Sequence, residues 1–422
     1  MKTRTSMLMT LRQCLAFLTP RERWQWVGLV PLMLLVAAME TVAAALVFEL
    51  IQMLNDPTQT THIPTVTTLS RALAGQHPQG LVLVFTLLVT VFYILKNAVL
   101  TVVAYVRSQL VSTSITSLAS RLLQRYLTMP YTYHLQRNSA DLISNITGSV
   151  NVVFSGVMTA AVAIASELLI MLGIITVLLV TTPFVTLMAL TILGGLLAVM
   201  LKLTRRTAHR WGAQTLILYR TILQSLQQAL GGVKEVRILG REGFFHTTFM
   251  RQHRALYHIK ARHTLLDDVP RLLVETTFVC GVLLMVLVLT LQAQAGSSPL
   301  PLLGLHAYAG FRIIPSANRL LWRINEIRSG TAAVLELYHD YTRLGGQGCS
   351  PVSPAPSQQL ALTQALVVEG VSYTYPGAST PALQDIHLTV RRCEAIGIVG
   401  PTGAGKSTLV DIITGLDRKS VV

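Results

Sequence analysis

The residues with the clearest chemical potential form a glycine-rich run near the end of the 422-residue chain. An apolar stretch predicted to be a strand, Ala395–Val399, leads into the run, and a helical pattern, Leu409–Leu416, follows it. A strand, a glycine-rich loop ending in lysine and a hydroxyl residue, and a helix together match the phosphate-binding P-loop pattern. The run consists of Gly400, Pro401, Thr402, Gly403, Ala404, Gly405, Lys406, Ser407 and Thr408.

Each residue type in the run has a role toward a nucleotide. The glycines let the backbone curl so that its N–H groups face phosphate oxygens, and the helix N-terminus adds the positive end of its dipole. Lys406 is placed for the β- and γ-phosphates and the Ser407 hydroxyl for Mg²⁺, while Thr408 can donate a further hydrogen bond. The expected cofactors are therefore ATP and Mg²⁺. The alternative is a chance glycine-rich turn, which the flanking strand and helix patterns disfavour.

The composition of the chain indicates a membrane protein. Hydrophobic residues make up 51% of the chain and charged residues only 13%, where a soluble domain carries about a quarter charged residues. The formal net charge is +15. Such an excess of positive charge would also suit a nucleic-acid-binding protein. The placement of the basic residues along the chain distinguishes between a membrane protein and a nucleic-acid-binding protein.

Apolar runs predict six transmembrane helices, since about 20 apolar residues span a bilayer as helix. The sixth run is the weakest because it contains His306, Arg312 and Pro315. The stretch from Thr19 to Glu22 reads as a capping box that starts the first helix. The six runs are Trp26–Phe48, Leu81–Val106, Val157–Thr181, Phe184–Leu201, Leu272–Leu291 and Leu300–Ala317.

The basic residues orient these spans. They gather in the N-terminal segment, in residues 107–156 and in residues 202–271, whereas the three opposite connections together hold only Arg71. By the positive-inside rule the N-terminus and both long loops are cytoplasmic. The charge therefore belongs to a multi-pass protein of the cell's inner (plasma) membrane, with the lipid bilayer rather than nucleic acid as its partner. Both long loops have helical periodicity, so the spans should continue as helices beyond the membrane.

The chain divides by composition into four parts. A cytoplasmic amphipathic segment, 1–25, precedes the transmembrane domain, 26–341. A Gly/Pro/Ser-rich linker, 342–363, leads to an α/β segment, 364–422, with short strands such as Ala365–Glu369 and Ile386–Val390. The predicted fold class is an α-helical membrane domain of six long helices followed by a truncated α/β P-loop domain.

The turn Tyr375-Pro376-Gly377 upstream of the P-loop resembles the start of the nucleotide-binding domain of ATP-binding-cassette (ABC) transporters. In that family an aromatic at the position of Tyr375 stacks on adenine; the alternative is an ordinary β-turn tyrosine. The six spans resemble the exporter-type membrane domain, and Pro130–Ser144 and Gly231–Phe245 resemble its two coupling segments. The resemblance implies ATP-driven transport by a dimer of half-transporters, expected to be a homodimer.

A narrower resemblance concerns the sixth span. The stretch Ala309–Arg319 resembles flippases for lipid-linked oligosaccharides, which implies an anionic, lipid-linked or amphipathic cargo. Arg312 is then the candidate substrate-binding residue. Two alternatives remain: a structural ion pair with an acidic residue such as Glu167, or a shorter span that leaves Arg312 at the interface.

Two further charged residues lie within the first two spans. Counting residues from the span ends places Lys96 near the inner interface and Glu40 in the outer half of the first span. At those depths the two side chains would be too far apart to pair.

The resemblance also predicts what the chain lacks. After Leu416 the family continues with a signature motif, a Walker B strand, a catalytic glutamate and a switch histidine, none of which is found in the sequence. We therefore expect no ATP hydrolysis from this chain, and the alternative function is an inactive half-transporter that acts only as an interaction partner. Residues 417–422 match a translated sequencing-adapter string, which predicts that the true protein is longer.

Overall fold

The computed structural model describes most of the chain, which forms two compact units. Unit 1 comprises Met1–Ser120 and Ile143–Asp340, and unit 2 comprises Arg121–Leu142 and Tyr341–Val422. The described residues are 7–55, 78–129, 131–135, 137–181, 183–292, 300–346, 364–375 and 378–414.

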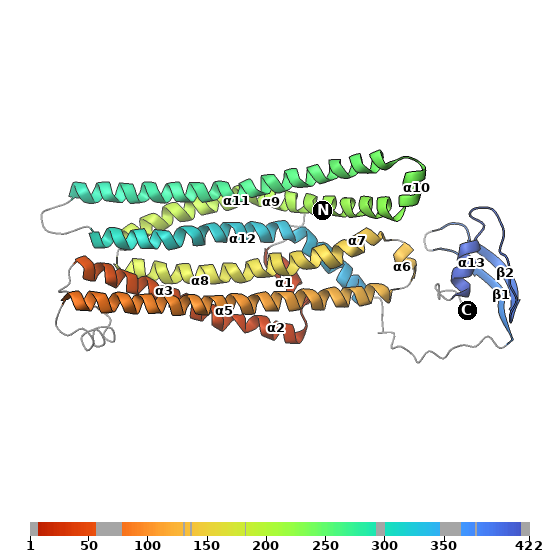
Figure 1. Ribbon diagram of the computed structural model, residues 1–422, viewed down its shortest axis with the longest axis horizontal. Coiled ribbons are helices and arrows are strands. Elements are labelled where there is room, and N and C mark those ends of the chain that lie inside the picture. The colour runs from red at the N-terminus through yellow and green to blue at the C-terminus, as the bar shows by residue number, and fades with distance from the viewer. Residues whose placement is uncertain are drawn as a thin grey trace. The chain divides into compact units, whose positions relative to one another are not determined.

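Unit 1 is built from long helices that run side by side (Figure 1). Four of the described helical stretches are long and apolar enough to cross a membrane: Pro20–Val47, Val82–Leu127, Ser139–Val180 and Thr186–Gly231. The predicted fifth and sixth spans fall in α11 and α12, where many side chains lie outside the described set. The helices are α1 (Met7–Ala16), α2 (Pro20–Val27), α3 (Leu29–Asn55), α5 (Pro78–Leu127), α8 (Thr159–Thr181), α9 (Pro183–Gly231), α11 (Glu242–Gln292) and α12 (Leu300–Gly346).

The predicted capping box at the start of α2 is confirmed. The Glu22 backbone N–H donates to Thr19 Oγ1 at 3.3 Å, and the Thr19 N–H donates to Glu22 Oε2 at 2.7 Å. This exchange satisfies two backbone donors that the helix leaves without acceptors. Farther along α2, the Trp26 indole N–H donates to Ser114 Oγ of α5 at 3.1 Å.

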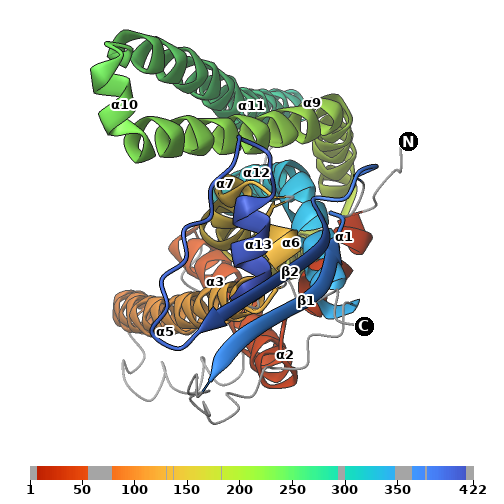
Figure 2. The ribbon, with the colours of Figure 1, turned by 90° about the vertical axis from the view of Figure 1, so that its right-hand side faces the viewer.

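The spans continue as helices well beyond bilayer length, as predicted. α9 and α11 contain 49 and 51 residues and are joined by the short helix α10 (Val233–Ile238). The α9–α10–α11 hairpin splays away from the other helices of unit 1 (Figure 2). Two short helices, α6 (Tyr131–Leu135) and α7 (Ser139–Ser144), follow α5. α6, α7 and α10 lie within the two segments predicted to couple the domains, and their coupling role stays a prediction.

The helix after α7 departs from α-helical geometry twice. Two π-helical segments, η1 (Asn145–Ser149) and η2 (Val152–Met158), precede α8. Each π turn accommodates more residues than an α turn, and such segments are often found at functional sites. The geometry therefore changes where the chain passes from the loop predicted to be cytoplasmic into the predicted third span.

Glycines let several of these helices approach one another closely. A side chain at Gly212 of α9 would overlap the Ser329 carbonyl of α12, and one at Gly173 of α8 would overlap Thr41 of α3. A Cβ on Gly330 would lie 2.7 Å from Val157 Cγ2 of η2. Small residues at such crossings allow the close packing typical of membrane helix bundles.

The prediction that Lys96 and Glu40 cannot pair is wrong. Lys96 Nζ donates to Glu40 Oε2 at 3.2 Å, and the two side chains are only 7% and 1% exposed. α3 continues to Asn55, past the predicted end of the first span, so Glu40 lies 15 residues before its end while Lys96 lies 18 residues after the start of α5. The two residues therefore lie at nearly the same depth, and Lys96 also lies over the Tyr93 ring at 4.3 Å.

Unit 2 contains a two-stranded antiparallel ribbon, β1 (Ala365–Tyr373) and β2 (Leu383–Arg391), with α13 (Lys406–Ile413) beside it (Figure 2). The predicted strands at Ala365–Glu369 and Ile386–Val390 are confirmed. The predicted strand at Ala395–Val399 is wrong: residues 394–400 are exposed and form no regular element. A strand needs a paired neighbour, and this segment has none among the described residues.

The cysteines allow a direct check of the packing of α1. Cys14 is fully buried, and burial raises the pKa of its thiol to about 12, whereas Cys393 is exposed. Only the thiolate reacts with maleimide, so a variant retaining Cys14 alone should label at least about a hundredfold more slowly at pH 8 than one retaining Cys393 alone. Equal rates in the folded protein would contradict this packing, and denaturation should make both rates equal.

Candidate nucleotide-binding site

The P-loop takes a conformation that requires glycine at two positions. Gly403 and Gly405 have φ angles of +88° and +81°, in the left-handed region that side chains disfavour. A Cβ on Gly405 would also lie 2.5 Å from the Ala382 carbonyl oxygen and 2.8 Å from Leu383 Cδ2. The loop is thus packed against the start of β2 immediately before α13 begins. Gly400, also predicted to curl the loop, is absent from the described positive-φ residues.

Lys406 occupies the first position of α13 and reaches back over the loop. Its Nζ donates to the Gly400 carbonyl oxygen at 2.8 Å and to the Pro401 carbonyl oxygen at 2.7 Å. Phosphate oxygens are stronger acceptors than neutral carbonyls. The ammonium group is therefore positioned to exchange these two contacts for contacts to a phosphate.

Tyr375 lies beside the first turn of α13. Its hydroxyl is 3.1 Å from Thr408 Oγ1, and its ring contacts Tyr373 edge to face, with centroids 4.9 Å apart. Thr408 is buried, so its hydroxyl faces Tyr375 rather than open space, whereas the neighbouring Ser407 is exposed. The structure thus brings the predicted aromatic residue and the end of the P-loop together across 33 residues of sequence.

The residues of the P-loop and the first turn of α13 fit a nucleoside triphosphate. Pro401, Thr402, Gly403 and Ala404 are exposed, and the first backbone N–H groups of a helix have no acceptor within it. Those N–H groups and Lys406 would hold the phosphates. The exposed Ser407 hydroxyl is the kind of oxygen that joins Mg²⁺ together with phosphate oxygens.

Arg312, the candidate cargo residue, lies in α12, and its side chain is outside the described set. Glu167, suggested above as a structural partner of Arg312, is instead bound by Arg319. Arg319 Nε donates to Glu167 Oε1 at 2.5 Å, and Arg319 Nη2 donates to Glu167 Oε2 at 3.2 Å. Sequence reasoning missed this bidentate pair because its members lie 152 residues apart.

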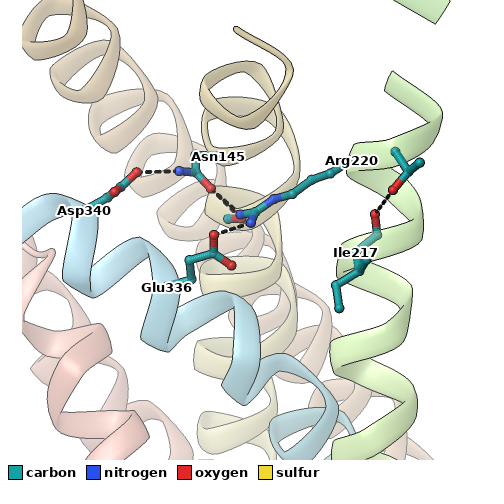
Figure 3. Close-up of polar contacts among 7 residues, drawn as sticks. Asn145, Ile217, Arg220, Glu336 and Asp340 are labelled. Atoms are coloured by element: carbon teal, nitrogen blue, oxygen red, sulfur yellow. Dashed lines mark hydrogen bonds and ion pairs between the residues drawn. The ribbon is translucent and has the colours of Figure 1, made fainter. Parts of the chain in front are cut away.

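A second polar cluster was also missed (Figure 3). Asn145 of η1 is buried; its Nδ2 donates to Asp340 Oδ2 at 2.9 Å, and its Oδ1 accepts from Arg220 Nη2 at 2.9 Å. Arg220 of α9 also forms an ion pair with Glu336, which, like Asp340, belongs to α12. The cluster joins three helices of unit 1, and only polar residues within otherwise helical patterns could have hinted at it.

Comparison with protein families agrees with this arrangement. Residues 32–290 match the family model described as the ABC transporter transmembrane region, and residues 383–420 match the model described as ABC transporter. The first match covers more than half of the chain. The second covers β2, the P-loop and α13.

Curated proteins similar to the chain include two flippases and one ATP-binding protein. The chain is 25% identical over 310 residues to an ATP-dependent lipid A-core flippase of Dechloromonas aromatica, covering 73% of the chain and 52% of the relative. The flippase of the same name from Pseudomonas fluorescens strain Pf-5 is 24% identical over 296 residues, 69% of the chain and 47% of the relative. The doxorubicin resistance ATP-binding protein DrrA of Mycobacterium tuberculosis is 52% identical over 54 residues, 13% of the chain and 16% of the relative.

The chain thus spans about half the length of the flippases it matches. The matched regions include both the membrane helices and the P-loop, and the sequence pattern and the structure agree with both. The chain therefore belongs to the ABC transporter family, and its membrane domain is of the exporter type.

Proposed function

We propose that the chain works within a dimeric ABC exporter that uses ATP to flip a lipid-linked or amphipathic substrate across the cytoplasmic membrane. The observation that carries this proposal is a P-loop with Lys406 at the start of α13 in the same chain as an exporter-type membrane domain. Family members named lipid A-core flippases support a lipid as the cargo class.

In this proposal two chains, expected to be identical, enclose MgATP between their nucleotide-binding domains. Lys406 and the first turn of α13 hold the phosphates, Ser407 joins Mg²⁺, and Tyr375 stacks on adenine. The short helices α6 and α10 pass the movement to the long helices. The N-terminus and the nucleotide-binding domain face the cytoplasm.

The cargo proposal rests on Arg312 in α12. A guanidinium in a low-dielectric cavity binds phosphate oxygens through two parallel hydrogen bonds. Because Arg319 supplies the bidentate partner of Glu167, that carboxylate has a partner without Arg312.

The test measures flipping of a fluorescent pyrophosphate-linked glycolipid in membrane vesicles. The vesicles hold the predicted longer protein, expressed from its native locus, because the 422-residue chain by itself is not expected to hydrolyse ATP. Arg312→Ala should lower flipping about tenfold relative to ATP turnover in the same vesicles, because a charge-assisted contact contributes about 1.5–3 kcal/mol. Arg312→Lys should restore part of the loss, since lysine keeps the positive charge but cannot form the two parallel hydrogen bonds of a guanidinium. An unchanged ratio in Arg312→Ala would rule out the cargo role.

The same vesicles separate this proposal from the alternative of an inactive interaction partner. Flipping that needs ATP and stops in Lys406→Ala supports the exporter. If vesicles without ATP flip the lipid as well as those with it, or if no flipping occurs at all, the exporter proposal fails.

A further inference from the structure

A groove of about 690 Å³ lies between α11 and α12 in unit 1. Among the residues that the structure describes, its polar lining consists of Arg271, Glu275, Asn318 and Arg319. The rest of its lining is mainly apolar, with Phe278 and Leu283 on α11 and Ile314 on α12. The residues proposed to bind nucleotide are not among the described lining residues of this groove.

The polar residues gather at one end. On α11, Arg271 and Glu275 precede Leu283, whereas on α12 Ile314 precedes Asn318 and Arg319. The two helices lie side by side and run in opposite directions (Figure 1), so the polar pairs meet. In the predicted orientation this end faces the cytoplasm. From Arg271 to Leu283 the helix rises about 18 Å, close to the hydrocarbon depth of one leaflet, about 15 Å.

The apolar end has a shaped wall. Gly310 of α12 has no side chain where the Phe278 ring of α11 lies, and any Cβ there would overlap that ring. The tip of the Phe278 ring can therefore come close to the α12 backbone. A groove with a polar end at the membrane surface and an apolar end toward the midplane has the polarity of a phospholipid in the inner leaflet.

The polar end carries both signs of charge. Arg271 offers guanidinium donors and Glu275 offers a carboxylate. Arg319 offers its Nη1, since its Nε and Nη2 donate to Glu167. Asn318 Oδ1 is buried and has no hydrogen-bond partner among the described residues, so it needs a donor. A phosphate satisfies the guanidinium groups. A primary ammonium brings both positive charge and N–H donors to the carboxylate and the amide oxygen. A quaternary ammonium has no donor, and a glycerol headgroup has hydroxyl donors but no positive charge.

We propose that this groove binds one phospholipid of the inner leaflet whose headgroup joins a phosphate to a primary ammonium, as in phosphatidylethanolamine. The phosphate lies at Arg271 and Arg319, the ammonium at Glu275 and Asn318, and the acyl chains along Phe278, Ile314 and Leu283. Lipid binding at this site needs no nucleotide, so the lipid-site proposal can be tested independently of the proposed transport.

The experiment titrates the purified protein, without ATP, with phosphatidylethanolamine, phosphatidylcholine and phosphatidylglycerol of identical acyl chains, and counts bound lipids by native mass spectrometry. Phosphatidylethanolamine should bind most tightly. Arg271→Ala should weaken its binding about tenfold, through loss of a charge-assisted contact. Glu275→Gln should remove the preference over phosphatidylcholine. Arg262→Ala, an exposed arginine on α11 outside the groove, is the matched control and should change nothing.

Two outcomes would overturn the proposal. A preference for phosphatidylglycerol that Glu275→Gln strengthens would assign the groove to an anionic lipid. Identical binding in Arg271→Ala, Glu275→Gln and Arg262→Ala would show that lipid does not occupy the groove, as expected if a second copy of the chain covers it. Arg319 is kept in every variant because it also binds Glu167, so a loss of affinity is not a loss of that ion pair.

Discussion

Lys96→Met is expected to destabilise the membrane domain by about 3–5 kcal/mol, because it removes the ammonium that binds the buried Glu40 carboxylate. Both side chains lie at membrane depth and are almost fully buried, where an uncompensated charge is costly. The double variant Lys96→Met with Glu40→Leu removes both charges and should recover most of the loss. Unfolding by a denaturing detergent, followed by circular dichroism, measures these differences.

The control is Lys202→Met, because Lys202 is an exposed lysine on α9. It should change the free energy of unfolding by less than about 0.5 kcal/mol, as surface substitutions usually do. If Lys96→Met is no worse than Lys202→Met, or if the double variant is as unstable as the single one, the pair does not hold α3 and α5 together in the way described.

Gly405→Ala should abolish MgATP binding, and Lys406→Ala should weaken it at least about tenfold. The alanine at 405 meets two obstacles: a φ of +81° and a Cβ that would lie 2.5 Å from the Ala382 carbonyl oxygen. Lys406→Ala removes the ammonium that lies over the loop. Binding is measured by titrating the purified protein with a fluorescent ATP analogue in the presence of Mg²⁺.

Gly397→Ala provides the matched glycine control. Gly397 is not among the positive-φ residues, and nothing lies within 4 Å of the Cβ it would gain, so this variant should bind nucleotide like the parent. Equal affinity in Gly405→Ala and Gly397→Ala would mean that the loop geometry described here does not govern binding.

Local patterns predicted much of the structure. The capping box at Thr19, the long helices and the strands around Ala365 and Ile386 follow from signals that lie within a few residues of each other. The turn and loop chemistry of the P-loop is local as well, so Gly403 and Gly405 could be placed from sequence alone. The prediction of a strand at residues 395–399 was wrong because a strand depends on a pairing neighbour, which the local pattern does not reveal.

Pairings between distant residues could not be predicted. Whether Lys96 meets Glu40 depends on where α3 ends, and the estimate from hydropathy stopped at Phe48 rather than Asn55. The contacts from Arg319 to Glu167 and from Arg220 to Asn145 join residues 152 and 75 positions apart. Such pairs depend on helix crossing angles and rotations, which periodicity leaves open.

The glycine contacts described above have a mechanical consequence. Gly212 of α9 packs closely against Ser329 of α12, and the next residue of α12, Gly330, packs closely against Val157 of η2. α9, α12 and η2 are therefore held together at one level along their lengths. A rigid helix held at one level along its length turns about that level. α9 is then a lever with arms of about 44 Å toward Pro183 and about 28 Å toward Gly231. A tilt that barely moves this fulcrum displaces the Pro183 end of α9 about one and a half times as far as its α10 end.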